Sequence, residues 1–242
     1  MFNYIWHTVF FDPIYNTLVF FIDHVPNGDV GLAIIATVMV VKVVLLPMAI
    51  KAARTQRIMR EIEPKLKEIK EIHKDDKEAQ AKEMMKTYSD FKLNPFASIL
   101  LLFIQIPVIF ALYFAVSNGG GIALPAINTN LLYSFIAEPV KISMHFLGYF
   151  DMTKQSVLLA LGAGVTQFFY IKQTLPVLPP RDNTKQADFK EDFTRNMHVQ
   201  MKYVMPVLIT GIAYSFPATI ALYFFVSNLV SIGLEYYVKK HR

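Results

Sequence analysis

Four polar side chains stand inside long apolar stretches of this sequence. Lys42 interrupts the apolar run 31–51, and three amides, Gln105, Gln167 and Asn228, interrupt three later runs. A helix rises about 1.5 Å per residue, so Lys42 lies about 13 Å from the polar end of its run, and Gln105 and Asn228 lie about 15–16 Å from the ends of theirs. An ammonium at that depth in hydrocarbon costs about 2.5–3.5 kcal/mol, so we expect it to face protein or water.

The shared depth of these groups predicts a wet, positively charged recess within the membrane. No Asp or Glu lies at this level to neutralise Lys42, and unpaired polar groups in lipid each cost several kcal/mol. Gln167 is somewhat shallower. Two plainer interpretations stay open. The stem of Lys42 can bend back towards the headgroups, and the amides can hydrogen-bond neighbouring helices.

The remaining reactive residue types do not predict an enzyme. The chain has no cysteine, and neither a Gly-rich phosphate loop nor a nucleophile elbow is present. The histidines lack the spacing of metal ligands; they stand at positions 7, 24, 73, 145, 198 and 241. We therefore expect no catalytic residue, no metal site and no cofactor.

The elements that carry the polar groups are predicted to be membrane-spanning helices. Hydrophobic residues make up 54% of the 242 residues and charged residues only 18%, which is typical of a polytopic membrane protein. A span needs about 20 apolar residues, and Ser215-Phe216-Pro217 divides the last apolar block in two. The five predicted transmembrane helices are 30–50, 95–117, 154–171, 201–215 and 216–238.

The first 29 residues hold three Asp and neither Lys nor Arg. Asp12-Pro13 is typical of a helix N-cap followed by proline at the first helical position, and apolar residues then recur at helical spacing. Asn16 and Asp23 weigh against a span over 10–25. We expect 1–29 to form an interfacial helix at the outer face, ended by a turn at Pro26-Asn27-Gly28.

Residues 51–94 form a charged segment, with 12 basic and 9 acidic residues between positions 51 and 92 by direct count. Two apolar stripes at helical spacing, joined by a turn at 73–76, predict an antiparallel helical hairpin. Pro64 should kink its first arm or restart it after a break. The charges indicate a solvated surface, and docking of a partner is the alternative interpretation.

The positive-inside rule orients the predicted helices. By direct count, 21 of the 24 Lys and Arg lie in the hairpin, the 172–202 region and the tail 239–242. These parts, including the loop 172–200, are predicted to be cytoplasmic. The amino terminus and the loop 118–153, which has room for a partly embedded helix, are then outside. The basic hairpin lacks the interleaved aromatic residues of a nucleic-acid surface, so no specific nucleic acid is expected.

Several stretches together resemble a known family, the YidC (Oxa-type) membrane protein insertases. They are VKVVLLPMAIKAARTQRIMREIEPKLKEI, EMMKTYSDFKLNPF, IQIPVIFALYFAV and ALYFFVSNLVSI, and they occur in the family's order. The resemblance covers about residues 1 to 240. It implies an all-α fold in the bacterial plasma membrane, with five transmembrane helices, an N-terminal interfacial helix and a cytoplasmic helical hairpin.

The resemblance also implies a function and a site. The family inserts membrane proteins through a hydrophilic groove that is open to the cytoplasm and to lipid. Lys42 occupies the position of the family's groove arginine, and Gln167 and Phe224 match groove-lining positions. A lysine keeps the charge but lacks the planar fork of arginine. The expected substrate groove comprises Lys42, Gln105, Gln167, Phe224 and Asn228.

The implied partners are nascent membrane proteins and membrane lipid. The ribosome, targeting factors and a secretion channel are further candidates, through residues 51–94 and the cytoplasmic tail. Two other functional classes stay open on the residues alone. One is a small-solute transporter or channel that uses Lys42 as an anion site, although an odd number of spans without a repeat weighs against it. The other is an assembly factor that binds membrane subunits without moving them.

Overall fold

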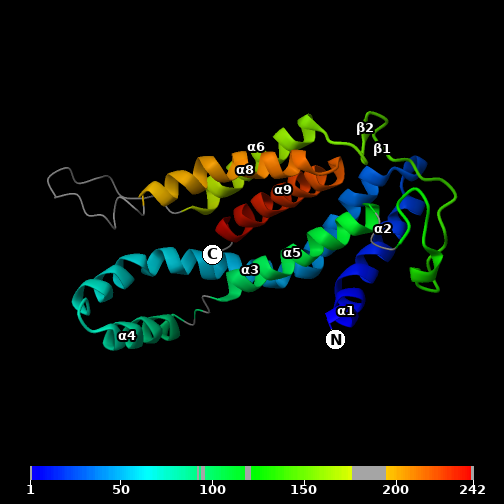
Figure 1. Cartoon of the computed structure of the whole chain (residues 1–242). Helices are drawn as coiled ribbons and strands as arrows, with labels where there is room; N and C mark the ends of the chain where they lie inside the picture. Colours follow the sequence, from blue (N-terminus) through cyan, green and yellow to red (C-terminus); the bar gives the residue numbers. More distant parts are fainter. Residues whose placement is uncertain (1, 92, 94–95, 118–120, 176–194, 241–242) are drawn as a thin grey trace. The chain divides into compact units, whose positions relative to one another are not determined.

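The computed structural model describes residues 2–91, 93, 96–117, 121–175 and 195–240. Several sequence predictions lie outside the described residues: the Asn94-Pro95 start of the second span, the 118–120 end of that span, most of the 172–200 loop, and residues 241–242 of the tail. The chain divides into two units, one of residues 1–44 and 106–236 and one of residues 45–105 and 237–242. Most described residues are helical, as predicted (Figure 1).

The first unit begins with a helical segment that differs from the prediction at Asp12. Helix α1 (Phe2–Ile5), the π-helix η1 (Trp6–Phe11) and α2 (Asp12–His24) follow one another directly. Asp12 has helical dihedral angles, so the prediction that it is an N-cap is wrong, and its carboxylate instead lies 2.9 Å from His7 Nδ1. The Asp12 N–H donates to the His7 carbonyl five residues earlier, so the wider π turn carries the helix into Pro13.

Helix α2 is held against the loop that begins at residue 121 by a buried amide. Asn16 is 1% exposed. Its Nδ2 donates to the carbonyls of Asp12 and Leu131, each at 2.8 Å, and its Oδ1 accepts from the Tyr133 N–H at 2.7 Å. The Tyr15 hydroxyl accepts from the Asn128 N–H at 2.9 Å. These bonds satisfy polar atoms that would otherwise be costly to bury.

The turn predicted at 26–28 is present as η2 (Pro26–Gly28), and α3 (Val30–Ile72) follows it. The Asp29 carboxylate begins this helix: its Oδ1 accepts from the Gly31 and Leu32 N–H groups at 2.8 and 3.1 Å. Its Oδ2 accepts from the Leu147 N–H at 2.7 Å. One buried carboxylate thus caps α3 and also ties a distant loop to it.

That loop, described over 121–156, contains no α-helix, so the suggestion of a partly embedded helix there is wrong for these residues. It holds a turn of 3-10 helix, η3 (Thr129–Leu131), and two short antiparallel strands, β1 (His145–Phe146) and β2 (Phe150–Asp151). Its backbone groups bond partly within short turns and the small hairpin, and partly to α2 and the start of α3, so they are satisfied without an α-helix. The strands also depart slightly from a purely helical fold (Figure 1).

The last three helices of the first unit meet through small residues. Helices α6 (Val157–Thr174), α8 (Met205–Ser215, preceded by η4, Gln200–Val204) and α9 (Ala218–Lys240) share a buried cluster of alanines. A Cβ on Gly164 would overlap the Thr210 hydroxyl, so only glycine permits the close approach of α6 and α8. The cluster consists of Ala160, Ala163, Ala213 and Ala221.

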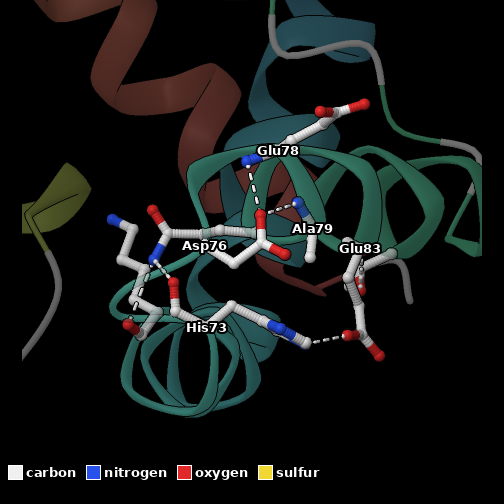
Figure 2. A network of polar contacts seen from close by, with 8 residues as sticks. His73, Asp76, Glu78, Ala79 and Glu83 are labelled. Carbon is white, nitrogen blue, oxygen red and sulfur yellow. Dashed lines mark hydrogen bonds and ion pairs between the residues drawn. The ribbon is translucent and has the colours of Figure 1, made fainter.

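The second unit contains the far part of α3, helix α4 (Lys77–Asp90) and the first part of α5 (Phe96–Ser117). Helix α3 is continuous through Pro64, without the predicted alternative of a break. Figure 2 shows the turn that follows: Asp76 caps α4 by accepting from the Glu78 and Ala79 N–H groups, and His73 pairs with Glu83 at 2.6 Å. Because Gln80 also donates to the Lys70 carbonyl, α4 returns beside the last turns of α3.

Two described stretches are long and apolar enough to cross a membrane: Val30–Met59 within α3, and α9. A shorter apolar stretch, Phe103–Ser117, lies in α5. Helices α5 and α6 expose large apolar side chains at helical spacing, which suits a lipid-facing surface. These side chains are Phe103, Ile106, Phe110 and Phe114 of α5 and Leu158, Leu161, Val165 and Phe169 of α6.

Candidate functional site

The candidate site is built around Lys42, which reaches α9 from the first part of α3. Its ammonium nitrogen donates to Ser231 Oγ at 3.3 Å. The Ser231 hydroxyl in turn donates to the Ser227 carbonyl at 2.8 Å, one helical turn earlier. A hydroxyl whose proton is engaged in this way presents only its lone pairs outward. Local helix geometry therefore orients Ser231 to accept a hydrogen bond from a cation.

The surroundings of Lys42 leave its charge without an anionic partner. In the part of the chain that the structure describes, no carboxylate lies within ion-pair distance of its ammonium. The next two residues, Val43 and Val44, are exposed, whereas Lys42 is half-buried. Since an ammonium has three donors and Ser231 occupies one, this group is suited to bind an anion transiently.

Asn228 lies close to this pair in sequence but is used differently. It is buried, and its Nδ2 donates to the Ala163 carbonyl and to Thr166 Oγ1 of α6 at 3.3 and 3.4 Å. Both partners belong to the neighbouring helix. Asn228 is thus used as in the second interpretation of the sequence, in which an amide hydrogen-bonds a neighbouring helix. It links α9 to α6 three residues before Ser231.

The other predicted residues are distributed over both units. Phe224 packs against the alanine cluster of α6, α8 and α9. Gln167 is half-buried and follows Thr166 on α6. Gln105 is half-buried on α5 but belongs to the second unit, whereas the other four belong to the first. The structure thus brings Lys42 to α9 and Asn228 to α6.

Sequence reasoning missed the partners of these residues, Ser231 and Thr166. The signal for Ser231 was present in the sequence, since it stands four residues after Ser227 and therefore on the same face of a helix. Thr166 gave no comparable signal, because a threonine that donates to its own helix is compatible with any apolar span. In the described ranges, the His, Asp and Glu side chains form no group of three that could hold a metal.

Residues 21–242 match the protein family described as 60Kd inner membrane protein. A protein of Syntrophobacter fumaroxidans named "Membrane protein insertase YidC" is 30% identical over 241 residues, which cover 99% of this chain and 39% of that protein. A protein of the same name from Clostridium tetani is 29% identical over 215 residues, which cover 89% of this chain and 84% of that protein.

These matches confirm the resemblance inferred from the motifs. A third protein with that name, from Pelobacter propionicus, is 29% identical over 235 residues, 97% of this chain and 39% of its own length. The chain therefore spans about two fifths of the Syntrophobacter and Pelobacter proteins and most of the Clostridium one. The matches and the apolar helices together indicate an inner-membrane protein.

Proposed function

Since this chain belongs to the 60Kd inner membrane protein family, which includes the YidC insertases, we propose that it inserts nascent membrane proteins into the lipid bilayer. The observation that carries the proposal is the placement of Lys42: a cation deep within an apolar helix, turned towards a neutral hydroxyl of α9. A structural cation at this depth would be expected to have an anionic partner. A cation held by one hydroxyl is suited to transient contact with an acidic substrate.

The proposed topology has five membrane-spanning helices: the first part of α3, then α5, α6, α8 and α9. The amino terminus lies outside and the carboxyl terminus in the cytoplasm. The distribution of Lys and Arg supports this orientation, and the exposed apolar stripes on α5 and α6 support their contact with lipid. In this arrangement α2 is an interfacial helix, and α3 and α4 form a cytoplasmic hairpin.

The proposed mechanism lowers the barrier to moving a polar segment through hydrocarbon. Water would fill a groove from the cytoplasmic side to the level of Lys42, which shortens the apolar path from about 30 Å to about half that length. Acidic residues of the substrate would be attracted by the ammonium, because no carboxylate among the described residues forms an ion pair with it. The apolar segment of the substrate would then leave sideways into lipid, where its own transfer free energy is favourable.

The predicted groove residues have different roles in this proposal. Lys42 supplies the charge, Gln105 and Gln167 supply neutral polar surface, and Phe224 supplies an apolar wall. Asn228 keeps α9 in register with α6 through its bonds to Ala163 and Thr166. The hairpin 51–94 and the cytoplasmic tail are the proposed contact surfaces for the ribosome, targeting factors or a secretion channel.

Charge reversal at Lys42 tests the electrostatic step. We expect Lys42→Glu to abolish insertion of a single-span substrate with an acidic tail, measured by protease protection after reconstitution into liposomes. Lys42→Arg keeps the positive charge and should retain insertion. A matched substrate with a neutral tail should lose much less with Lys42→Glu. Equal insertion by the Glu and Arg variants would contradict the electrostatic step, and solute flux without insertion would contradict the proposed function itself.

A further inference from the structure

We propose that the tip of the β1–β2 hairpin, Leu147-Gly148-Tyr149, inserts into the interfacial layer of the lipid bilayer beside the start of α3. We call these three residues the hairpin tip. The partner is the boundary between headgroups and acyl chains, not a protein. The proposal is independent of the insertase function and of the site at Lys42.

The hairpin tip exposes large apolar side chains that the fold does not use. Tyr149 is 87% exposed and Leu147 is 56% exposed. Both strands are only two residues long, so these side chains stand at the end of a small, tight loop. Apolar side chains gathered in this way on an exposed turn indicate an interaction surface rather than a core.

The turn itself is built with an unusual residue. Leu147 and Gly148 both have positive φ, 53° and 79°, and the Tyr149 N–H donates to the Phe146 carbonyl. Turns with positive φ at both central positions strongly prefer Asn-Gly or Asp-Gly, because a bulky side chain is strained there. The sequence places a leucine where asparagine would be less strained. A role for the apolar side chain outside the folded chain accounts for that choice.

Hydrogen bonds fix the hairpin tip to the first turn of α3. The Leu147 N–H donates to Asp29 Oδ2 at 2.7 Å, and the Val30 N–H donates to the Ser143 carbonyl at 3.0 Å. A Cβ on Gly31 would overlap the ring of Phe146, so the hairpin lies directly on the helix backbone. Because α3 is long and apolar enough to cross the membrane, its first turn marks the membrane surface.

The other side of the hairpin is bonded to the second membrane-capable helix. The Ala218 N–H, at the start of α9, donates to the Lys154 carbonyl at 2.7 Å, and Thr219 Oγ1 donates to the Met152 carbonyl at 3.0 Å. The hairpin therefore bridges the first turns of two helices that can cross the membrane. Both turns must lie at the same membrane surface, and the hairpin tip is held at that level.

Lipid is the occupant that this position favours. A tyrosine has an apolar ring and a polar hydroxyl, and it is enriched where membrane meets water. A leucine beside it gains free energy from burial among acyl chains. A protein partner would need no fixed relation to the ends of α3 and α9. An interfacial contact requires that relation, and the hydrogen bonds of Asp29 and Ala218 provide it.

Quenching by brominated lipids tests the position of the hairpin tip. The chain has one tryptophan, so the full-length Trp6→Phe protein with Tyr149→Trp carries a single indole. After reconstitution into liposomes, we expect its fluorescence to be quenched more by lipids brominated near the headgroups than by lipids brominated near the chain ends. Two further single-indole proteins set the scale: Val43→Trp, exposed near the middle of the membrane-capable stretch Val30–Met59, and Asp75→Trp in the charged turn.

The Val43→Trp indole should be quenched most by deep bromines, and the Asp75→Trp indole by neither lipid. A Tyr149→Trp indole that behaves like the one at position 75 overturns the proposal. Should Trp6→Phe impair folding, the absence of cysteine in the chain allows the same comparison with a nitroxide on Tyr149→Cys and collision with oxygen or a water-soluble nickel chelate. A nitroxide there that is reached mainly by nickel overturns the proposal equally.

Leu147→Asn is the matched variant. It should raise the thermal stability of the detergent-solubilised protein, because asparagine tolerates positive φ, and it should reduce the quenching of the Tyr149→Trp indole by shallow bromines. Unchanged quenching would show that Leu147 does not contribute to a lipid contact, and so would contradict the proposal.

Discussion

Two charged side chains, one that caps α3 and one within it, have opposite environments. Asp29 and Lys42 are 13 residues apart, about 20 Å along the helix. The carboxylate accepts three backbone N–H groups at 2.7 to 3.1 Å, whereas the ammonium makes one 3.3 Å hydrogen bond to a neutral hydroxyl. The first charge is fully used in holding the fold together. The second is held by one hydrogen bond to a neutral group, and this difference is the basis for proposing a structural role for Asp29 and a functional role for Lys42.

Removal of the Asp29 carboxylate should have the largest effect on stability. Asp29→Ala leaves three backbone donors without their acceptor, and we expect a loss of about 3 kcal/mol or more. Asp29→Asn retains a helix cap but faces the Leu147 N–H with a poorer acceptor, so its loss should be smaller. Thermal unfolding in detergent measures both. If Asp29→Ala were as stable as the wild type, Asp29 would not stabilise the fold as we infer.

Lys42→Met should have the opposite effects to Asp29→Ala: stability should be retained and insertion lost. The change removes an ammonium that costs about 2.5–3.5 kcal/mol at this depth, so the folded protein should be as stable as the wild type or more so. Insertion of a substrate with an acidic tail should nevertheless be lost. The same unfolding and liposome measurements apply. A Lys42→Met protein that unfolds as readily as Asp29→Ala would mean that Lys42 is structural too.

Ser231→Ala tests the hydroxyl that contacts the Lys42 ammonium, and we expect it to affect insertion less than Lys42→Met does. The variant removes the one hydroxyl that the structure shows in contact with the ammonium. We expect a stability change of about 1 kcal/mol or less, with insertion reduced but retained. Ser231→Thr keeps a hydroxyl and serves as the control. If the alanine variant abolishes insertion as fully as Lys42→Glu, the hydroxyl does more than position the ammonium.

Asp151 is a second carboxylate that is hydrogen-bonded within the fold, and we expect changes around it to have the smallest effect on stability. The Thr153 hydroxyl holds the pKa of Asp151 at about 2, with smaller contributions from the Thr153 N–H and from Lys154, while partial burial opposes them. A depressed pKa stabilises the fold above the unfolded value near pH 4, and that contribution disappears as the pH falls to about 2.

Thr153→Val should therefore raise the pKa of Asp151, measured from its side-chain 13C shift during an acid titration. The slope of thermal stability between pH 4 and 2 should become shallower in this variant. An unchanged pKa would mean that Lys154 rather than Thr153 holds the charge.

The sequence predicts the surroundings of Lys42 better than those of Asp29. Lys42 is conspicuous because an ammonium in an apolar run has few explanations. Its partner Ser231 is less conspicuous, but the four-residue spacing from Ser227 already places both on one face. Both inferences depend on the spacing of residues along one helix, and a folded helix keeps residues four apart on the same face.

The surroundings of Asp29 depend on pairs that are far apart in the chain. Asp29 before an apolar run predicts a helix cap, yet nothing in the sequence points to Leu147 as its second donor. Asn16 weighs against a membrane span over 10–25, but nothing in the sequence points to its hydrogen bonds with Leu131 and Tyr133. The short β-hairpin was missed because strands of two residues have no periodicity to detect.

The bonds of Asn16 also set an order of events during synthesis. Its carbonyl partner on Leu131 lies 115 residues later in the chain. At about 5–20 residues per second, the ribosome needs about 6–23 s to make that partner after Asn16 has been added. For that interval the Asn16 side chain lacks its partners at 131 and 133, so we expect it to be hydrated until that part of the loop has been made.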